Sequence, residues 1–310
     1  MKAADKAGEK VLILGGGSNL LISDAGFAGT VIRVESKGNA LDYDACSGGM
    51  IEVSAGEDWD KFVELTIEKG FADLESLSGI PGTVGGAPIQ NIGAYGHEVS
   101  ETIARVKAYD RKKGEVITFT NEQCHFSYRN SAFKEDAGRY VILNVTFQLR
   151  KGEMSLPITY AELANYLSVN LGDRAPVMKV RQAVLELRGR KGMLINSSDV
   201  NSNSAGSFFV NPILTKEIAD KLPADAPRWP QSDGRVKTSA AWLMEHAGVS
   251  KGEKIAGAQI SSKHVLALTN SGDATADNII ELAKMARAKV FEKFGIKLEA
   301  EVQLVGLDLN

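Results

Sequence analysis

The sequence predicts an α+β fold built in two parts, and three observations support this prediction. Two short apolar runs, 105–110 and 115–120, flank a turn of charged residues and glycine, which is the pattern of a β-hairpin. Apolar and polar residues alternate along 140–149, as in a strand with one buried face. After about residue 150 the strand patterns give way to helical periodicities. Strands followed by helices are typical of α+β proteins.

The first part begins with an apolar run, 11–14, that ends in glycine and predicts a buried strand leading into a tight turn. The runs 31–34 and 51–53 predict two further strands. Asp58 is a typical N-cap residue, and the apolar spacing after it predicts a helix that ends at Gly70.

The second part begins where the pattern breaks, around 150–154, and we place a domain boundary there, which gives domains 1–155 and 156–310. The run 177–190 predicts a basic amphipathic helix whose charges most simply face solvent. The remaining expected elements are helices over 238–246 and 279–294, the second closed by Gly295, and a final strand over 300–305.

Composition limits the functions open to the chain. Its 310 residues are 44% apolar and 24% charged with a formal net charge of -3, a globular composition that gives no general affinity for nucleic acid. The two cysteines, Cys46 and Cys124, have no metal-binding spacing, so we expect buried free thiols and no metal site. Neither a membrane-spanning stretch nor a signal peptide is found in the sequence, so we expect a cytoplasmic protein.

The segment 79–96, GIPGTVGGAPIQNIGAYG, is the most unusual part of the chain because six of its 18 residues are glycine. Such a segment buries little side-chain area, but it lets the main chain approach a ligand closely and present N–H groups to it. A second glycine turn follows the apolar run near the N-terminus, in GGGSN at 15–19. Two such cradles indicate a large phosphate-bearing cofactor. The alternative is a glycine-rich surface loop.

Three further residues are candidates for chemistry. Arg129 lies among aromatic residues, so its guanidinium needs an anionic partner, and a structural salt bridge is the alternative. Ser207 lacks the G-x-S-x-G context of a nucleophile and is better suited to donate a proton, unless it is a turn serine. Glu299 and Glu301 face the same way in the expected final strand, where one is solvated and the other can reach a cavity. A wholly solvated face is the alternative.

Together these segments resemble one family. The strings GGGSN, IPGTVGGAPIQNIGAYG, FSYRNSAFK, AGSFFVNP and LEAEV follow one another in this order, and the chain closely resembles the UDP-N-acetylenolpyruvoylglucosamine reductase family from about residue 11 to residue 306. The resemblance implies a flavin-binding domain of the vanillyl-alcohol-oxidase type that holds FAD, followed by a substrate-binding domain.

The resemblance also implies the reaction. NADPH reduces FAD, the flavin N5 passes a hydride to C3 of UDP-N-acetylglucosamine enolpyruvate, and a proton is added at C2. The product is UDP-N-acetylmuramate, an intermediate of peptidoglycan synthesis. We expect a monomer that works without a nucleic-acid or membrane partner.

Matching the family strings residue by residue implies roles for individual side chains. Arg129 holds the substrate carboxylate or the intermediate, Ser207 donates the proton to C2, and Glu301 assists Arg129 or relays a proton. The expected substrate contacts are Tyr160, Lys191, Asn211, Lys263 and His264. The expected FAD contacts are Gly15, Gly16, Gly17, Ser18, Asn19, Pro81, Gly82, Thr83, Gly85, Gly86, Gln90, Asn91, Gly93, Ala94, Tyr95 and Gly96.

Two alternatives and one departure remain open at the level of the sequence. The first alternative is that the chain is another FAD oxidoreductase of the same superfamily. The second is that it is a nucleotide-sugar binder without flavin. Family members usually carry a few dozen residues before the GGGSN string, including a strand of the flavin domain. We therefore expect this chain to bind FAD weakly or fold poorly unless that segment is restored. The absorption spectrum with and without added FAD checks this expectation.

Overall fold

The computed structural model describes residues 1–44 and 48–310, so Cys46 lies outside the described residues. The chain divides into two compact units. Unit 1 consists of residues 1–17 and 28–189, and unit 2 consists of residues 18–27 and 190–310. The units divide at Gly189, whereas the sequence pattern placed the domain boundary near residue 155.

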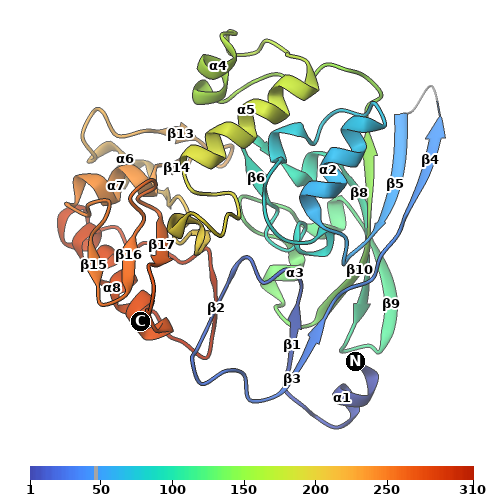
Figure 1. Cartoon of the computed structure of the whole chain (residues 1–310), viewed down its shortest axis with the longest axis horizontal. Helices are drawn as coiled ribbons and strands as arrows, with labels where there is room; N and C mark the ends of the chain where they lie inside the picture. Colours follow the sequence, from blue (N-terminus) through green and yellow to red (C-terminus); the bar gives the residue numbers. More distant parts are fainter. Residues whose placement is uncertain (45–47) are drawn as a thin grey trace. The chain divides into compact units, whose positions relative to one another are not determined.

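Unit 1 is built on a five-stranded antiparallel sheet (Figure 1). In spatial order its strands are β4 (Asn39–Asp44), β5 (Gly48–Ser54), β10 (Tyr140–Leu149), β8 (Ile103–Asp110) and β9 (Glu115–Thr120). Helix α2 (Trp59–Glu68) contributes Trp59, Phe62 and Val63 to the core beside this sheet. The side chain of Asp58 accepts the Lys61 N–H at 3.0 Å, so the expected N-cap is confirmed.

Strand β10 departs from the expected alternation at one point. Its pairing with β8 shifts register between Ile142 and Asn144, which is a β-bulge. Ile142 is therefore buried, whereas Leu143 is only partly buried, although strict alternation places Leu143 on the buried face. The residues beyond the bulge, from Val145 to Leu149, alternate as expected.

Further elements complete unit 1, and the last of them ends one residue beyond it. They are α1 (Lys2–Lys6), β1 (Val11–Leu14), β3 (Thr30–Arg33), η1 (Glu75–Leu77), η2 (Val84–Gly86), β6 (Gly93–Ala94), β7 (His97–Glu98), η3 (Val99–Glu101), η4 (Glu122–Cys124), α3 (Ala132–Glu135), α4 (Ala161–Leu167) and α5 (Val177–Arg190). Strands β1 and β3 pair in parallel. The predicted strands at 11–14 and 31–34 are thus present, the second shifted by one residue.

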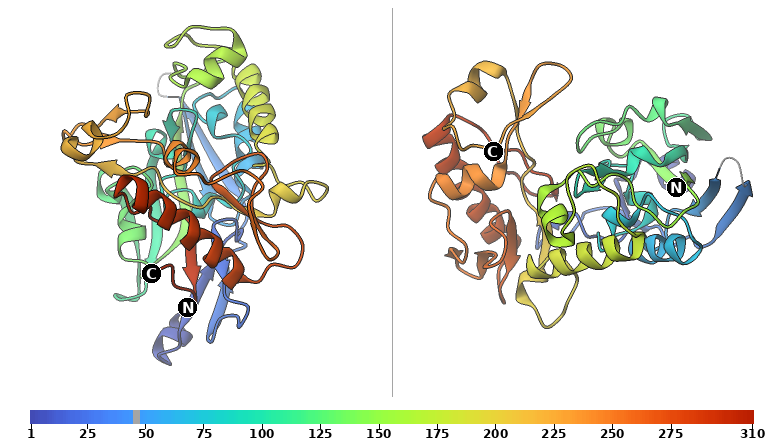
Figure 2. Two further views of the ribbon diagram at one scale, coloured as in Figure 1. Left: turned by 90° about the vertical axis from the view of Figure 1, so that its left-hand side faces the viewer. Right: turned by 90° about the horizontal axis from the view of Figure 1, so that it is seen from above.

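Helix α5 explains why the compact unit extends past residue 155. It lies beside α2 (Figures 1 and 2). Its Arg181 forms a two-pronged ion pair with Asp60 of α2, with N–O distances of 2.6 and 3.0 Å. Val177 joins the core of the sheet, while Val180 and Leu187 pack in a second cluster of unit 1. The break at 150–154 marks the end of the sheet, and the chain then returns to cover α2.

Unit 2 contains a four-stranded sheet, in the order β11 (Ser204–Ser207), β17 (Ala267–Asn270), β16 (Ala258–Ile260) and β15 (Lys254–Ile255). A second sheet consists, in spatial order, of β12 (Ile213–Leu214), β14 (Val236–Lys237) and β13 (Trp229–Pro230). Its helical elements are η5 (Val200–Ser202), α6 (Lys216–Asp220), α7 (Ala240–His246) and α8 (Ala276–Phe294). The last helix buries Ile279, Leu282, Ala286 and Val290, and it ends at Gly295 with φ of 68°, as expected.

A parallel pair of short strands closes unit 2. Strand β2 (Leu20–Ile22) pairs with β18 (Gln303–Val305), which joins the N-terminal segment 18–27 to the end of the chain. The predicted strand at 300–305 is therefore shorter, and Glu301 precedes it. Ala300 instead forms an isolated bridge with Phe209.

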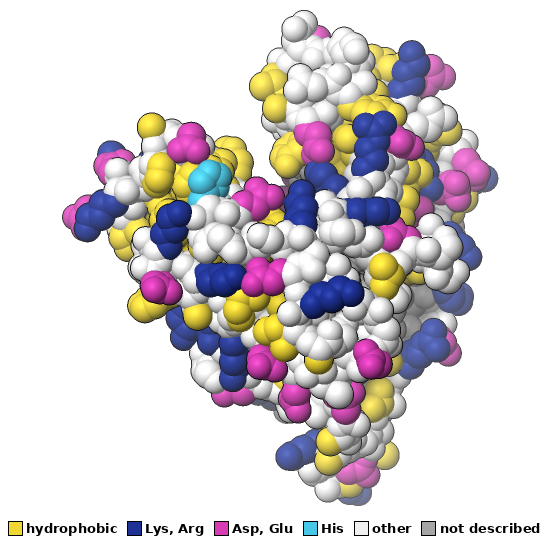
Figure 3. Space-filling model, turned by 60° about the vertical axis from the view of Figure 1, so that its left-hand side comes forward, with side chains coloured by type: hydrophobic (Ala, Val, Ile, Leu, Met, Phe, Trp, Pro, Cys, Tyr) yellow, Lys and Arg dark blue, Asp and Glu magenta, His cyan; other side chains and the backbone are white. Residues whose placement is uncertain are grey.

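The surface and the buried thiol agree with the composition. Side chains of both charge signs are interspersed on the face in Figure 3. No helix within the described residues is long and apolar enough to cross a membrane. Cys124 is buried and free, and burial raises the pKa of its thiol to about 12. This thiol is therefore protonated and unreactive at neutral pH.

Candidate active site

The two glycine-rich segments that lie far apart in the sequence meet in unit 1. A Cβ atom on Gly16 would lie 2.8 Å from the Cα of Gly82, and one on Gly15 would lie 2.8 Å from Oγ1 of Thr83. Real Cβ atoms do not approach backbone so closely. Glycine is therefore required at position 16 for the two main chains to pack against each other.

Side chains from two helices hold the start of the segment 79–96. The Gly79 N–H donates to Asp60 at 2.6 Å, and Nε of Arg188 donates to the Gly79 carbonyl at 3.1 Å. Arg181 in turn binds Asp60. Burial alone would raise the pKa of Asp60, but the hydrogen bonds from Arg181 and Gly79 outweigh it and lower that pKa. Asp60 is therefore ionised and fixes the conformation of this turn.

The segment that carries Arg129 packs directly on the segment 79–96. Asn91 donates to the Ser127 carbonyl at 3.1 Å, and the Arg129 guanidinium donates to the Gly93 carbonyl at 2.8 Å. Ser131 donates to the Ile89 carbonyl at 2.6 Å. Arg129 itself has φ of 54°, an uncommon conformation for a residue with a side chain. The structure thus brings together two of the segments that the sequence singled out.

Some of the expected FAD contacts are used by the protein itself. The Asn91 side chain is buried, donates to Glu98 and Ser127, and accepts the Ser100 N–H. Its role in the structure is to hold the loop together. Ser18 and Asn19 belong to unit 2, while Gly15 to Gly17 belong to unit 1, so the GGGSN string divides between the units.

In unit 2, Ser207 lies beside His264. The Ser207 hydroxyl oxygen and Nε2 of His264 are 3.4 Å apart, and both residues are partly buried. Phe208 and Phe209, which follow the serine, point into the core of unit 2. Ser207 ends strand β11, where it pairs with Ala267 of β17. This arrangement puts a hydroxyl and an imidazole side by side, which is a pair suited to proton transfer.

A polar network that the sequence did not indicate holds the backbone at His264. The backbone N–H of His264 donates to the Ser261 hydroxyl at 3.2 Å, and that hydroxyl donates to Oδ1 of Asn201 at 2.8 Å. Asn201 donates to Asp199, which forms an ion pair with Lys263 at 2.7 Å. The hydrogen bond from Lys263 lowers the pKa of Asp199 to about 2. Ser261 and Ser262 precede the expected Lys263 and His264 in the sequence, whereas Asn201 lies far from them and is brought near only by folding.

The backbone segment that carries Glu301 runs beside the segment that carries Ser207. Its N–H donates to the Phe208 carbonyl at 2.8 Å, and its carbonyl accepts from the Asn19 amide at 3.2 Å. Glu301 is half-buried, whereas Glu299 is exposed. The expectation that one of the two glutamates is solvated thus agrees with the structure. Because Asn19 and Glu301 share this bond, the end of the GGGSN string supports the Glu301 backbone.

The remaining expected substrate contacts lie in both units. Tyr160 of unit 1 is 41% exposed, and its ring meets that of Tyr95 edge to face at 5.5 Å. Oδ1 of Asn211 in unit 2 accepts the Ala240 N–H at 2.9 Å, which satisfies a donor in the first turn of helix α7. Lys191 of unit 2 is half-buried. Arg129 and Tyr160 therefore belong to one unit, and Ser207, His264 and Glu301 belong to the other.

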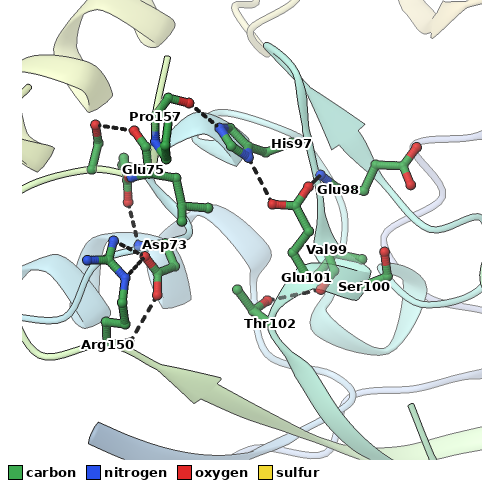
Figure 4. Close-up of polar contacts among 12 residues, drawn as sticks. Asp73, Glu75, His97, Glu98, Val99, Ser100, Glu101, Thr102, Arg150 and Pro157 are labelled. Atoms are coloured by element: carbon green, nitrogen blue, oxygen red, sulfur yellow. Dashed lines mark hydrogen bonds and ion pairs between the residues drawn. The ribbon is translucent and has the colours of Figure 1, made fainter. Parts of the chain in front are cut away.

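A cluster of charged groups lies just beyond the segment 79–96 (Figure 4). His97 contacts Glu101 and the Pro157 carbonyl, at 2.8 and 3.0 Å. Nearby, Glu75 is almost fully buried and accepts the N–H groups of Asp73 and Leu156. Asp73 binds Arg150 through its carboxylate, and Asp73, Glu101 and Arg150 line a polar cavity of about 410 Å³. The described residues include no group of three or more potential ligands that would hold a metal ion.

The main chain of unit 1 fits a large cofactor. Gly16 and Gly82 pack at van der Waals limits without side chains, and Gly17, Gly82 and Gly96 have positive φ. Main chain that carries no side chains at such positions lets a ligand approach it closely, as is typical of sites for a diphosphate. The residues present are therefore compatible with FAD.

Comparison with known proteins gives matches over both parts of the chain. Residues 1–120 match a family described as an FAD binding domain, and residues 198–305 match the C-terminal domain of UDP-N-acetylenolpyruvoylglucosamine reductase. The UDP-N-acetylenolpyruvoylglucosamine reductase of Cutibacterium acnes is 49% identical over 99% of this chain and 81% of that protein. That of Streptomyces avermitilis is 48% identical over 100% of this chain and 86% of that protein.

A solved structure agrees with these relatives. The crystal structure of the UDP-N-acetylenolpyruvylglucosamine reductase from Thermus caldophilus superposes with a TM-score of 0.63 at 25% identity. The superposition covers 97% of this chain and 88% of that one.

Proposed function

The chain belongs to the UDP-N-acetylenolpyruvoylglucosamine reductase family, and from this premise we propose how its own residues perform the reaction. It is an FAD-dependent oxidoreductase of peptidoglycan synthesis. The finer parts of the proposal are the reductant, NADPH, and the substrate, UDP-N-acetylglucosamine enolpyruvate. We also propose that the enzyme acts as a monomer in the cytoplasm, without a nucleic-acid or membrane partner.

One observation supports the proposed site most directly. The guanidinium of Arg129 donates to the carbonyl of Gly93, inside the segment proposed to cradle FAD. A cation is thus held beside the flavin segment by a short, directional bond. When bound, FAD supplies the redox chemistry, a hydride received from NADPH and delivered to C3 of the enolpyruvyl group.

Arg129 stabilises the charge that this addition creates. Hydride addition at C3 leaves negative charge at C2, which spreads into the adjacent carboxylate. A guanidinium binds a planar carboxylate through two parallel N–H donors, so Arg129 suits both the substrate and the charged intermediate. Removing one such donor from other enzymes costs roughly 3–4 kcal/mol of transition-state stabilisation.

Ser207 completes the addition by giving its hydroxyl proton to C2. A new C–H bond forms at C2, and the O–H bond of Ser207 breaks. The serine oxygen then regains a proton through His264, whose Nε2 lies 3.4 Å away. Glu301 lies on the neighbouring backbone segment. It assists Arg129 or relays a proton.

The other proposed contacts position the substrate and the cofactor. Tyr160, Lys191, Asn211 and Lys263 bind the nucleotide sugar. The FAD contacts are the main chain at Gly15 to Gly17 and along the segment 79–96. Since the Asn91 side chain is occupied within the protein, its contribution is to shape this main chain.

Two half-reactions test the proposal. The full chain, mixed anaerobically with added FAD and NADPH, should lose its flavin absorbance. The absorbance should return only when UDP-N-acetylglucosamine enolpyruvate is added, with UDP-N-acetylmuramate as the product. Reduction of the flavin by unrelated alcohols, or its reoxidation by unrelated aldehydes, would instead favour another FAD oxidoreductase. Binding of the nucleotide sugar without any flavin band would favour a flavin-free binder.

A further inference from the structure

The last two residues of the segment 79–96 and His97, which follows it, contact one short segment, Pro157 to Tyr160. The ring of Tyr95 meets that of Tyr160. A Cβ atom on Gly96 would overlap the side chain of Thr159, so the glycine lets the two segments pack closely here. Nε2 of His97 lies 3.0 Å from the Pro157 carbonyl oxygen (Figure 4). The two segments thus run past each other in unit 1, and His97 joins them.

Both ring nitrogens of His97 face acceptors. Nδ1 lies 2.8 Å from the Glu101 carboxylate, and the Pro157 carbonyl has no proton to donate. A neutral imidazole has a single N–H, whereas an imidazolium has two. With Glu101 ionised, both hydrogen bonds form together only when His97 carries a positive charge.

The surroundings favour that charge. Glu101 of η3 and the buried Glu75 of η1 face His97, and Glu98 follows it in the chain. Burial alone would lower the pKa of His97, but the hydrogen bond to Glu101 outweighs it and raises that pKa above its ordinary value of 6.5. Burial raises the pKa of the Glu75 carboxyl. The negative charge of Asp73, next to Glu75, is balanced by its ion pair with Arg150.

We propose that His97 is a positioning residue that, as an imidazolium, holds the Pro157–Tyr160 segment against Tyr95 and so orders Tyr160 for the nucleotide-sugar substrate. This inference rests on the proposed function of Tyr160. Ile158 is anchored separately, through the backbone of Asp173 and Gly172, so loss of the His97 bond loosens the segment without releasing it.

The pH dependence has a definite sign. Because the folded pKa lies above the ordinary imidazole value, the Pro157 contact is complete below that value. One of the two hydrogen bonds is lost as the pH rises through the folded pKa. Substrate binding should therefore weaken toward alkaline pH. A hydrogen bond to a charged group is worth roughly tenfold in an equilibrium constant, so we expect KM for the nucleotide sugar to rise about tenfold.

The test uses the full chain with saturating FAD, from about pH 6 to about pH 9, a range that brackets the imidazole pKa. In the unaltered protein, KM should rise with pH while flavin reduction by NADPH stays constant. His97→Gln retains one donor but no charge, so its KM should be independent of pH and equal to the alkaline value. Glu101→Gln should move the transition toward lower pH. A purely structural role would not shift a pH profile.

A matched control and a second readout separate the outcomes. His246→Gln, on an exposed histidine of unit 2, should keep the original profile. Fluorine NMR of 3-fluorotyrosine protein, with the Tyr160 signal assigned by Tyr160→Phe, should show Tyr160 titrating together with His97. If the Tyr160 signal titrates with His97 in a protein that does not reduce the enolpyruvyl substrate, the positioning role of His97 is supported and the proposed function is overturned. If His97→Gln keeps the original KM profile, or Tyr160 does not titrate, the positioning role is overturned.

Discussion

The half-buried hydroxyl of Ser207 is the clearest single-residue target, because its proposed task belongs to only one half-reaction. Ser207→Ala removes the proposed proton donor and leaves untouched the glycine-rich segments of unit 1 that are proposed to bind FAD. Flavin reduction by NADPH should proceed at the original rate, while reoxidation by the enolpyruvyl substrate should slow by about 10²–10⁴-fold. Stopped-flow absorbance at the flavin band measures both rates. Equal slowing of the two half-reactions would mean that Ser207 is structural.

Arg129 allows a test of geometry at constant charge. Arg129→Lys keeps a cation and one donor for Gly93 but loses the planar fork, so turnover should fall by about 10²-fold or more. Steady-state kcat/KM measures the change, and bound FAD is quantified in parallel. Arg105→Lys, at an exposed position of β8, is the matched control and should be neutral. Turnover close to that of the control would place the carboxylate-binding group elsewhere.

The sequence predicted individual site residues unevenly, for a physical reason. Glycine strings were informative because a close approach excludes every other residue, as at Gly16. Asn91 and Asn211 were harder to interpret, since an amide has the same identity whether it binds a ligand or a backbone group. Both accept a backbone N–H of the protein here, and the contact of Asn211 with the nucleotide sugar stays a prediction. Asn201 and Ser261 were missed because their partners depend on folding.

At the scale of elements, the contact between the two glycine segments is testable. Gly16→Ala places a methyl group 2.8 Å from the Cα of Gly82, so the two segments must move apart. Overpacking of this kind costs roughly 1–3 kcal/mol, and we expect FAD affinity to weaken about tenfold or more. FAD titration followed by flavin fluorescence measures the dissociation constant. Gly272→Ala is the control, since its methyl group meets open space. Unchanged FAD affinity in Gly16→Ala would show that this contact does not shape the cofactor site.

Elements with a strong local pattern were predicted closely. Strand β10 and helix α5 have the expected bounds, because alternation and amphipathic spacing are properties of the segment itself. The bulge in β10 was not foreseen, since it depends on the register with β8. Strand β2 is three residues long and pairs with a strand near the opposite end of the chain. Its local sequence therefore carries no pattern that predicts a strand.

At the scale of the whole molecule, unit 2 depends on a segment from the N-terminal part of the chain. Leu21 of β2 pairs with Leu304 of β18 and packs against the core of unit 2. Leu21→Ala should lower the free energy of unfolding of unit 2 by roughly 1–3 kcal/mol, less than for a fully buried leucine. Hydrogen exchange should show faster exchange in 190–310, with unit 1 unaffected.

The neighbouring residue of β2 provides the control for this prediction. Ile22 is 37% exposed, so Ile22→Ala should change exchange far less than Leu21→Ala. Equal loss of protection in both units after Leu21→Ala would contradict the assignment of residues 18–27 to unit 2.

The same connectivity has a consequence for gene recombination. The chain passes between the units at residues 17, 27 and 189, so the coding sequence of unit 2 is interrupted. A single crossover near codon 190 would transfer the codons of β18 to another gene, whereas those of its partner strand β2 would stay in the original gene. Exchange of an intact unit 2 between paralogous genes requires further breakpoints around codons 18 and 27. Such triple events are rare, and the two units should therefore have been inherited together.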